Sequence, residues 1–600
     1  MKAQKTYLVE VITISKNSGH EPLSYFSAIK LQSGTLVRVP MRKSFVIGVV
    51  QSSRSVLSAK SDIRRAAFSL KKISKKDIYN ASLAPEFIAA AEITAAYYAT
   101  STGAILGAVL PKTILDEPAT YLKNTARKKR HVGHSKETIL LQMEITERFG
   151  QYRALVRQSF ARGNSVMFIV PTHQDGLRAF LELSRGISEF VHTQKSWRAA
   201  VSLPHPILFI TTPAGVAFHR PDLDTIIVER ENSRAYRTLA RPYINWKIFI
   251  ETWAKKAKKQ LVLGDSVLSV EILWREKRGD YGESSLVRWR LPGALTRLVD
   301  AKSPQNERGR FEIFSDELKK LLEKAMAENE EIFLFGARKG LAPTTVCGEC
   351  GTILECENCK APLVLHYRSG ERVYICHACG SQREAATRCA YCKSWKLVPL
   401  GIGTEVIARA AKELFPKYNV YILDKDHARN DARAKNIVKK FRDTGGILVG
   451  TELAFSYLES VPYSGLVSVD ALFSIPDFGI NERIFYLVSR LREMTQKESV
   501  VQTRNIGKQV LAWAAQGNII DFYLSEIAER ESLLYPPFSV FIKIDSLLPR
   551  DKLLKWNPEI YRNSLIIRMP RDRWPDAELA EALSLLGPRF NIKVDPESIL

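Results

Sequence analysis

Outside one short segment the chain has no cysteine, because all eight of its cysteines lie between Cys347 and Cys392. It also lacks internal repeats, low-complexity tracts and any run of the roughly 18–20 uncharged apolar residues that a membrane span needs. The opening MKAQKTYLVEVITISK alternates apolar and polar residues and contains charges, which is typical of a strand and not of a signal peptide. We therefore expect a cytoplasmic protein with no membrane partner.

Acidic residues are the second shortage. The 600 residues include 88 Lys+Arg but only 64 Asp+Glu, a formal charge of +24. This excess favours a polyanionic partner, most often nucleic acid, and the alternative is a solvated basic surface. Residues 1–130 carry 21 of the basic and 8 of the acidic residues, a net charge of +13, with dense runs at 64–76 and 127–130. Because neutralised phosphates release counterions, we predict that residues 1–130 supply most of the DNA affinity. For 127–130 a charged linker is the alternative.

The eight cysteines form four CxxC pairs, Cys347/Cys350, Cys356/Cys359, Cys376/Cys379 and Cys389/Cys392. A CxxC turn places two sulfur atoms on one side of a tight loop, which is half of a tetrahedral zinc site. The four halves predict two structural zinc ions, and disulfides are disfavoured in the cytoplasm. Nested pairing would join the outer pairs and the inner pairs, whereas cross-bracing would join first with third and second with fourth. Nesting suits a compact module, but the spacing leaves both open.

Zinc binding would also change the charge balance. Eight thiolates around two Zn²⁺ lower the charge of the chain to about +20. The segment 347–400 has seven basic residues and five glutamates, so it becomes about −2. We predict that this zinc module contacts proteins and binds phosphates poorly.

The apolar pattern predicts a multidomain α/β protein, and 600 residues with 45% hydrophobic content allow about three to five domains. Residues 1–80 alternate as in a small β-rich domain, and 85–110 are typical of a helical or winged-helix element. Apolar runs such as ETILLQ, SVMFIVPT, TIIVERE and EIFLFGAR then alternate with helical stretches, and they resume after the cysteines with NVYILDKD and GLVSVDA. This favours two doubly wound lobes, with the zinc module inserted in the second.

The order of these features resembles the primosomal protein N′ (PriA) family of replication restart proteins over nearly the whole chain. The most specific part is CGECG…CENC…LVLHYRSG…YICHACG…CAYC followed by GIGTEVI. Further matches are ARKG (337–340), FP (415–416), GTE (450–452), VDA (469–471), PDF…ER (476–483), QT (502–503) and YPPF (535–538). The resemblance implies nested zinc pairing, with Cys347, Cys350, Cys389 and Cys392 on one ion and Cys356, Cys359, Cys376 and Cys379 on the other.

The resemblance also implies a division of the chain. We expect a β-rich 3′-end DNA-binding domain at 1–84, a winged-helix element and basic linker at 85–130, a degenerate P-loop-helicase-like lobe 1 at 131–300, lobe 2 at 301–346 and 400–531, the zinc module at 347–399, and an abbreviated α+β C-terminal domain at 532–600.

The nucleotide motifs of the family are absent from the places where they belong. No G-x-x-x-x-G-K-[S/T] string occurs in the sequence, although its glycines and lysine cradle phosphates. The four altered places are 143–150, 229–232, 265–271 and 490–497. Phe149 stands at the P-loop lysine, Arg230 stands where the catalytic acid belongs, and Met494 stands at the arginine-finger position. We therefore predict no catalytic residue, no nucleotide-binding residue and no ATP hydrolysis on a retained helicase fold.

The DNA-binding part of the family matches better. LSY (23–25) aligns with the family's FDY, with Ser24 in place of the Asp that contacts the terminal hydroxyl. The resemblance implies DNA contacts from Tyr25, Gly34, Arg38 and Lys71, with Tyr25 stacked on a base. For each of these residues a role in maintaining the fold is the alternative.

The predicted function is therefore replication restart. The chain would bind forked or D-loop DNA and the 3′ end of a nascent strand. It would recruit other primosome and replication proteins, among them single-stranded DNA-binding protein, with two zinc ions as its cofactors. The alternative from the enzyme class is an active ATP-dependent 3′-to-5′ DNA helicase of superfamily 2, and a third candidate is a zinc-ribbon RNA-binding factor.

Overall fold

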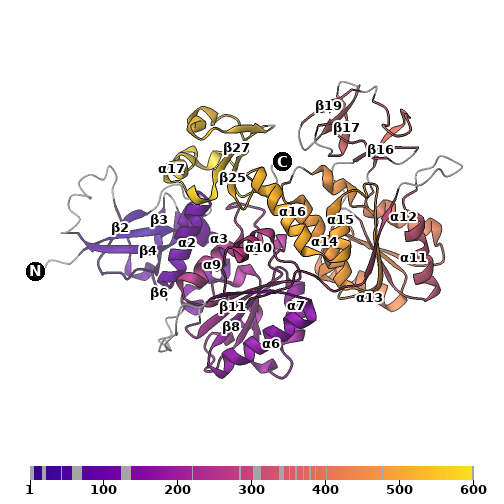
Figure 1. The fold of residues 1–600 in the computed structure, drawn as a ribbon. Helices are drawn as coiled ribbons and strands as arrows, with labels where there is room; N and C mark the ends of the chain where they lie inside the picture. Colours follow the sequence, from indigo (N-terminus) through magenta and orange to yellow (C-terminus); the bar gives the residue numbers. More distant parts are fainter. Residues whose placement is uncertain are drawn as a thin grey trace, which may run out of the picture. The chain divides into compact units, whose positions relative to one another are not determined.

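The computed structural model describes residues 6–15, 22–41, 44–56, 70–122, 137–218, 220–282, 285–301, 312–336, 344–349, 352–358, 361–368, 371–376, 380–384, 387–400, 402–475, 477–561 and 563–597. The chain divides into two compact units. The first consists of 1–268, 275–287 and 534–596, and the second of 269–274, 288–533 and 597–600. The described residues contain five sheets (Figure 1), so the prediction of a multidomain α/β protein is confirmed.

The N-terminal sheet has the strand order β5-β2-β1-β4-β3-β6. Its strands are β1 (Tyr7–Thr13), β2 (Leu23–Ser27), β3 (Thr35–Met41), β4 (Ser44–Ser55), β5 (Lys71–Lys72) and β6 (Ile78–Ser82). The Tyr25 hydroxyl on β2 donates to the carbonyl of Pro40 on β3 at 3.4 Å, although these strands are not neighbours in the sheet. The sheet therefore curls around a core that includes Val9, Val37 and Ile73. The strands predicted for residues 1–80 are therefore present, within the first compact unit.

Helices follow this sheet, namely α2 (Pro85–Tyr97), α3 (Thr102–Val109), α4 (Lys112–Asp116) and α5 (Pro118–Tyr121). Phe87 of α2 packs edge-on against Phe249 and Trp253 of α9 (Trp246–Lys256), with ring centroids 5.1 and 5.5 Å apart. Over the described residues 85–122 the chain forms helices and no strand, so a winged-helix element stays a prediction. The basic run at 127–130 lies outside the described residues.

Lobe 1 is built on a parallel sheet with the order β13-β7-β12-β11-β8-β10-β9. Its strands are β7 (Thr138–Gln142), β8 (Ser165–Ile169), β9 (Val191–Thr193), β10 (Leu208–Thr211), β11 (Leu223–Glu229), β12 (Gln260–Asp265) and β13 (Leu286–Val287), and its other helices are α6 (Ile145–Ala161), α7 (His173–Leu183) and α8 (Trp197–Ala200). Every residue of β8, β10 and β11 is buried. Burial on both faces explains why these strands read as continuous apolar runs.

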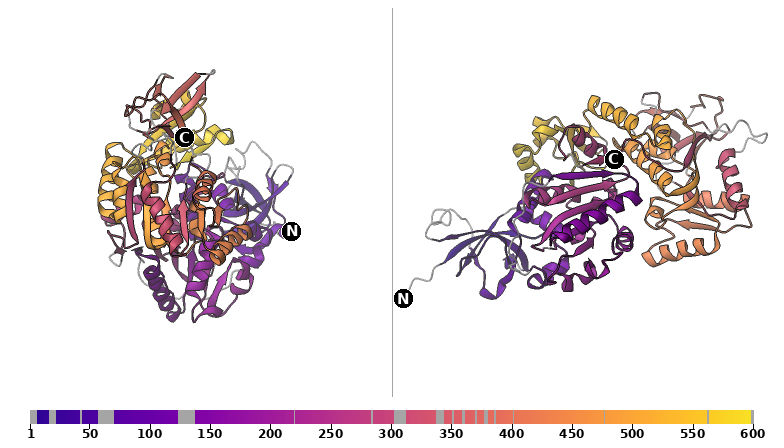
Figure 2. Two further views of the ribbon diagram at one scale, coloured as in Figure 1. Left: turned by 90° about the vertical axis from the view of Figure 1, so that its right-hand side faces the viewer. Right: turned by 60° about the horizontal axis from the view of Figure 1, so that its bottom comes forward.

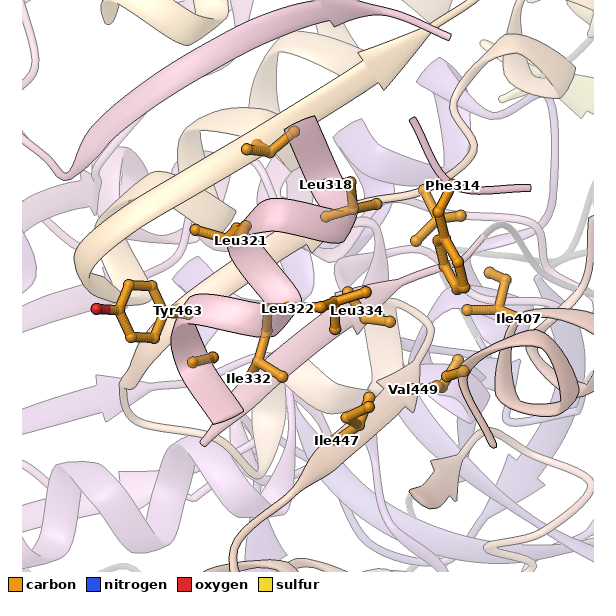
Figure 3. Packing of buried hydrophobic residues seen from close by; sticks show 14 of the residues in the cluster. Phe314, Leu318, Leu321, Leu322, Ile332, Leu334, Ile407, Ile447, Val449 and Tyr463 are labelled. Carbon is orange, nitrogen blue, oxygen red and sulfur yellow. The ribbon is translucent and has the colours of Figure 1, made fainter. Parts of the chain in front are cut away.

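Lobe 2 has a second parallel sheet, with the order β14-β24-β23-β15-β22-β21. Its elements are β14 (Leu295–Asp300), α11 (Asp316–Ala327), β15 (Ile332–Phe335), α12 (Thr404–Leu414), β21 (Val420–Leu423), α13 (Asp431–Thr444), β22 (Ile447–Gly450), β23 (Val461–Leu466), α14 (Ile480–Met494), β24 (Thr495–Thr503), α15 (Gln509–Gln516) and α16 (Ile519–Ser532). Leu318 and Leu322 of α11 pack toward Leu334 of β15 and its neighbours in the core (Figure 3). Because β14 pairs with β24, the predicted lobe boundary at 300 is wrong, and the second unit begins again at 288.

The zinc module has an antiparallel sheet in the order β19-β18-β17-β16-β20. These strands are β16 (Thr344–Cys347), β17 (Leu363–Arg368), β18 (Glu371–Cys376), β19 (Gln382–Arg383) and β20 (Leu397–Leu400). Its buried cluster consists of four cysteines and the five residues Leu354, Leu363, Leu365, Tyr374 and Leu397. The module is inserted between β15 and α12 of lobe 2, as the apolar pattern predicts.

The C-terminal segment forms an antiparallel sheet in the order β26-β27-β25-β28. Its elements are β25 (Ser539–Ile544), β26 (Glu559–Tyr561), β27 (Ser564–Pro570), α17 (Ala577–Leu586) and β28 (Ile592–Val594), while α10 (Val270–Lys277) divides between the two units. The Trp574 indole N–H donates to the carbonyl of Tyr97 at 2.9 Å, and Arg237 donates to the carbonyl of Asp595 at 2.6 Å. The small C-terminal domain is thus fixed to α2 and to lobe 1 within the first unit (Figure 2). None of the helices described is long and apolar enough for a membrane span.

Candidate functional site

The DNA-binding candidates of the N-terminal domain differ in accessibility. Arg38 and Lys71 are exposed, and the Arg38 guanidinium lies 4.7 Å from the ring centroid of Phe45, which is 53% exposed. Phe45 was missed by the sequence reasoning, and its only signal is an apolar residue directly after the basic run MRKS. The pair offers a cation and an aromatic ring on one surface, and surfaces that bind single-stranded nucleic acid combine these two kinds of group.

Tyr25 does not fit the predicted role of stacking on a base. Its side chain is only 4% exposed and lies in the core of the curled sheet, where burial raises the pKa of its hydroxyl. Because almost none of the side chain is exposed, neither ring face is open to a base. The prediction is corrected: Tyr25 is a core residue that closes the sheet.

Gly34 has a backbone requirement of its own. Its φ is +89°, and an added Cβ would lie 2.4 Å from the carbonyl oxygen of Leu83. Only glycine adopts this turn without strain, so the fold alone accounts for Gly34. The basic run at 64–76 has four lysines in the described part, and all four are exposed: Lys71, Lys72, Lys75 and Lys76. Arg64 and Arg65 lie outside the described residues.

The resemblance to the PriA family places the nucleotide loop at the junction of β7 and α6, and residues 137–161 are all described. Only Met143 and Glu144 separate the end of β7 from the first residue of α6. Phe149, aligned with the P-loop lysine, is a helical core residue whose ring centroid lies 5.6 Å from that of Tyr152. The junction therefore has no glycine loop whose N–H groups could surround a phosphate.

A buried charge cluster fills the space beside this junction. The fully buried Arg148 of α6 binds the carboxylate of Glu229 through two hydrogen bonds, Nε to Oε2 at 2.9 Å and Nη2 to Oε1 at 2.7 Å. Its Nη1 donates to the carbonyl of Met143. The Tyr152 hydroxyl also donates to Oε2 of Glu229, at 2.7 Å. Both oxygens of Glu229 are thus occupied by protein donors, in the bidentate geometry that is strongest for an arginine–carboxylate pair.

Gly264 on β12 makes room for this cluster. A Cβ at Gly264 would lie 1.8 Å from the Tyr152 hydroxyl oxygen and 3.0 Å from Cδ of Arg148. Burial, reinforced by the Glu229 charge, raises the pKa of Tyr152 well above its ordinary value. The tyrosine therefore stays protonated and remains a donor to Glu229.

The residues after Glu229 are also engaged by the protein. Arg230 donates from Nη1 to Oδ1 of Asp175 at 2.7 Å, and Lys247 pairs with Glu231. In lobe 2, Met494 is buried at the end of α14, and Arg490 pairs with Glu493 of the same helix. The altered motifs thus form intramolecular contacts where they are described.

The four cysteine pairs share one backbone turn. In each, the N–H of the first cysteine donates to the carbonyl five residues later. These bonds are Cys347 to Thr352 at 2.9 Å, Cys356 to Ala361 at 2.8 Å, Cys376 to Ser381 at 2.8 Å and Cys389 to Ser394 at 2.8 Å. In the fourth pair, where both cysteines are described, the two sulfur atoms lie within 4.8 Å of each other, as a zinc ligand pair requires.

The sulfur atoms of Cys347, Cys389 and Cys392 lie within 4.8 Å of one another, with Cys347 and Cys392 only 3.4 Å apart. These residues come from the first and the fourth pair. Cys356 and Cys376 are both buried, and each lies next to the segment 361–363, through the Cys356–Ala361 bond and the Leu363–Cys376 register. Cys350, Cys359 and Cys379 lie outside the described residues. The described cysteines fit a metal ion held by thiolates.

Two kinds of comparison find similar proteins, one for the N-terminal residues and one along most of the chain. The family model of the PriA 3′ DNA-binding domain matches residues 12–111. The match includes α2 and α3, so the predicted domain boundary at 84 falls inside it.

Two similar proteins are both known as replication restart protein PriA. The one from Thermotoga maritima is 27% identical over 483 residues, which cover 73% of this chain and 64% of the relative. The one from Treponema pallidum is 26% identical over 403 residues, 64% of this chain and 60% of the relative. The chain thus spans less than two thirds of the length of these relatives. A solved structure of S. cerevisiae Dbp5 aligns with 75% of this chain and 98% of its own, at 10% identity and a TM-score of 0.38.

Proposed function

We propose that the chain is a member of the PriA family of replication restart proteins and acts as a DNA-binding restart factor without helicase activity. It binds forked or D-loop DNA, including the 3′ end of a nascent strand, through its N-terminal domain. It then recruits other primosome and replication proteins, with single-stranded DNA-binding protein among the partners. The two lobes serve as a scaffold and not as a motor.

The DNA-binding part of the proposal is supported by three properties of the N-terminal region. The family match covers residues 12–111, the first 130 residues have a net charge of +13, and Arg38 and Lys71 are exposed. Contacts of this kind recognise the phosphate backbone and the shape of a DNA end, and not a base sequence.

The observation that carries the loss of helicase activity is the buried Arg148–Glu229 pair. Phosphoryl transfer needs backbone N–H groups around the phosphates and a carboxylate that holds Mg²⁺. At this junction two residues replace the loop, and the carboxylate of Glu229 is neutralised by Arg148. Opening the site would leave two buried charges without partners, which costs several kcal/mol.

Two structural zinc ions complete the proposal. One is held by Cys347, Cys350, Cys389 and Cys392, and the other by Cys356, Cys359, Cys376 and Cys379. The nested arrangement is favoured over cross-bracing because the sulfur of Cys347 lies beside those of Cys389 and Cys392. Four thiolates close each site, so the ions stabilise the module and take no part in a reaction.

The test of the proposal is DNA-stimulated ATP hydrolysis by the purified chain. We expect a rate on forked DNA that does not differ from that of the Glu229→Gln variant. Turnover that requires Glu229 would overturn the scaffold proposal in favour of an active helicase.

DNA recognition is tested separately by binding at several salt concentrations. Forked DNA should bind more tightly than structured RNA at matched salt. Replacing both Arg38 and Lys71 by Ala should lower the slope of log K against log salt by about 0.9 for each phosphate that these side chains neutralise. Arg185→Ala, an exposed arginine of lobe 1, is the control and should leave the slope unchanged. Equal slopes for both variants would exclude this surface.

A further inference from the structure

We propose that the fourth cysteine turn, residues 388–396, is a contact for single-stranded DNA, in which Tyr391 and Trp395 stack on unpaired bases. This inference rests on the proposed DNA-binding function and adds a second contact, in the other compact unit from the N-terminal domain.

The first observation is the exposure of the two rings. Tyr391 is 80% exposed and Trp395 is 73% exposed, which makes them the exposed large apolar side chains of the described zinc module. Tryptophan normally buries most of its surface, because its ring is the largest apolar group among the side chains. Two exposed rings four residues apart are therefore available to a ligand.

The second observation is the distribution of charge within the module. All five glutamates of 347–400 precede residue 385, whereas 385–400 contains Arg388, Lys393 and Lys396 and no acidic residue. These three basic residues are exposed. The net charge of the metal-bound module is about −2, but its basic residues without acidic neighbours lie together in 385–400. The prediction that the module binds phosphates poorly therefore does not apply to this turn.

The third observation is a lysine in a glycine position. The turns at Cys376 and Cys389 have the same backbone bonds, with Gly380 N donating to Cys376 O at 2.9 Å and Lys393 N to Cys389 O at 3.0 Å. Gly380 has a φ of +77°, and Lys393 adopts +61° at the equivalent position. A left-handed lysine is strained where glycine is not, and such strain is common where a side chain has a function.

Single-stranded DNA is the ligand that these features fit. In a duplex the base faces are covered by their neighbours, so only unpaired bases can stack on protein rings. Aromatic rings interleaved with lysines are the composition of single-strand binding surfaces. The backbone bonds of the turn fix the main chain from which both rings project, so less of the chain has to be ordered on binding.

The experiment measures binding of the full-length zinc-loaded chain to a labelled oligothymidylate and to a blunt duplex of equal length. For the variant Tyr391→Ala/Trp395→Ala, we expect affinity for the oligothymidylate to fall at least about fivefold for each ring, and duplex affinity to stay within about twofold. The variant Tyr391→Phe/Trp395→Phe keeps the ring faces and should retain most of the affinity. Zinc content equal to that of the unchanged chain verifies that the module is folded.

A backbone-matched variant tests the charge. Lys393→Gly restores the residue type that the Cys376 turn uses, so the fold is kept while one cation is removed. The slope of log K against log salt for the oligothymidylate should fall by about 0.7. Unchanged oligothymidylate binding by the double alanine variant would overturn the inference, and a loss of protein binding alone would assign the rings to a protein partner. If the unchanged chain bound no DNA at all, the proposed function itself would fail with it.

Discussion

The junction of β7 and α6 buries one carboxylate and the zinc module gathers several cysteine sulfur atoms, and the two sites compensate their negative charge differently. At the junction, the carboxylate of Glu229 receives three hydrogen bonds from Arg148 and Tyr152. In the module, the sulfur atoms of Cys347, Cys389 and Cys392 lie within 4.8 Å, a spacing that thiolates tolerate when a metal ion joins them. At the junction the protein's own side chains compensate the charge, whereas the cysteine cluster fits a bound metal ion.

The strongest test of this contrast is removal of zinc. Among the described residues, the cluster around the cysteines contains five other buried residues, so we expect the module to unfold when a chelator removes the metal. Each site should contribute on the order of 10 kcal/mol. Elemental analysis should give two zinc ions per chain, and limited proteolysis should then cut within 344–400.

The control for this experiment is lobe 1, whose thermal transition should be unchanged by the chelator. If the module stayed resistant to the protease without metal, its fold would not depend on a metal ion, and the contrast with the junction would be lost. A content of one zinc per chain would refute the nested pairing of eight cysteines.

The next largest effect is expected at the junction itself. Arg148→Met leaves Glu229 buried with one donor, and breaking a buried pair in this way costs about 3–5 kcal/mol. The free energy of unfolding of the first unit, from denaturant titration, measures this cost. Arg153→Met on the same helix removes a partly exposed pair with Glu182 and should cost less than about 1 kcal/mol.

The double variant Arg148→Met/Glu229→Leu sharpens this measurement. Removing both charges should recover most of the loss, because apolar side chains of similar volume replace a buried pair at little cost. If the double variant were as unstable as Arg148→Met alone, the loss of stability would not come from the unpaired charge of Glu229.

A smaller effect is expected from Tyr152→Phe. The hydroxyl is one of three donors to Glu229, and a hydrogen bond to a charged group contributes about 1.5–3 kcal/mol. The same unfolding titration measures the loss. A cost below about 0.5 kcal/mol would indicate that water replaces the hydroxyl and that the junction is less closed than its hydrogen bonds imply.

The two sites also differ in how far the sequence predicts them. The cysteine spacing predicts the turns because each pair is local, and the apolar runs predict both parallel sheets because their strands are buried on both faces. The Arg148–Glu229 pair joins residues 81 positions apart, and no local pattern signals such a pair. The sequence predicts that no glycine-rich loop follows β7, but it does not predict which side chains pack at this junction.

The errors have similar causes. β14 is an edge strand with alternating exposure, and its sequence does not say which of two sheets it joins. Tyr25 lies on a strand whose alternation predicts a face, but whether that face is closed depends on the curl of the whole sheet. Register and closure are tertiary properties, so both required the structure.

The smallest expected effect is that of nucleotide. If the junction of β7 and α6 is closed by Arg148, millimolar Mg-ATP should leave the thermal midpoint of the first unit unchanged. A ligand present at 100 times its Kd would stabilise the fold by about 2.7 kcal/mol, a shift of several degrees that calorimetry resolves. A shift that Glu229→Gln abolishes would show that Arg148 yields its carboxylate to the ligand. The junction would then be a site that opens to bind nucleotide, and it would depend on a ligand in part, as the zinc module is expected to do.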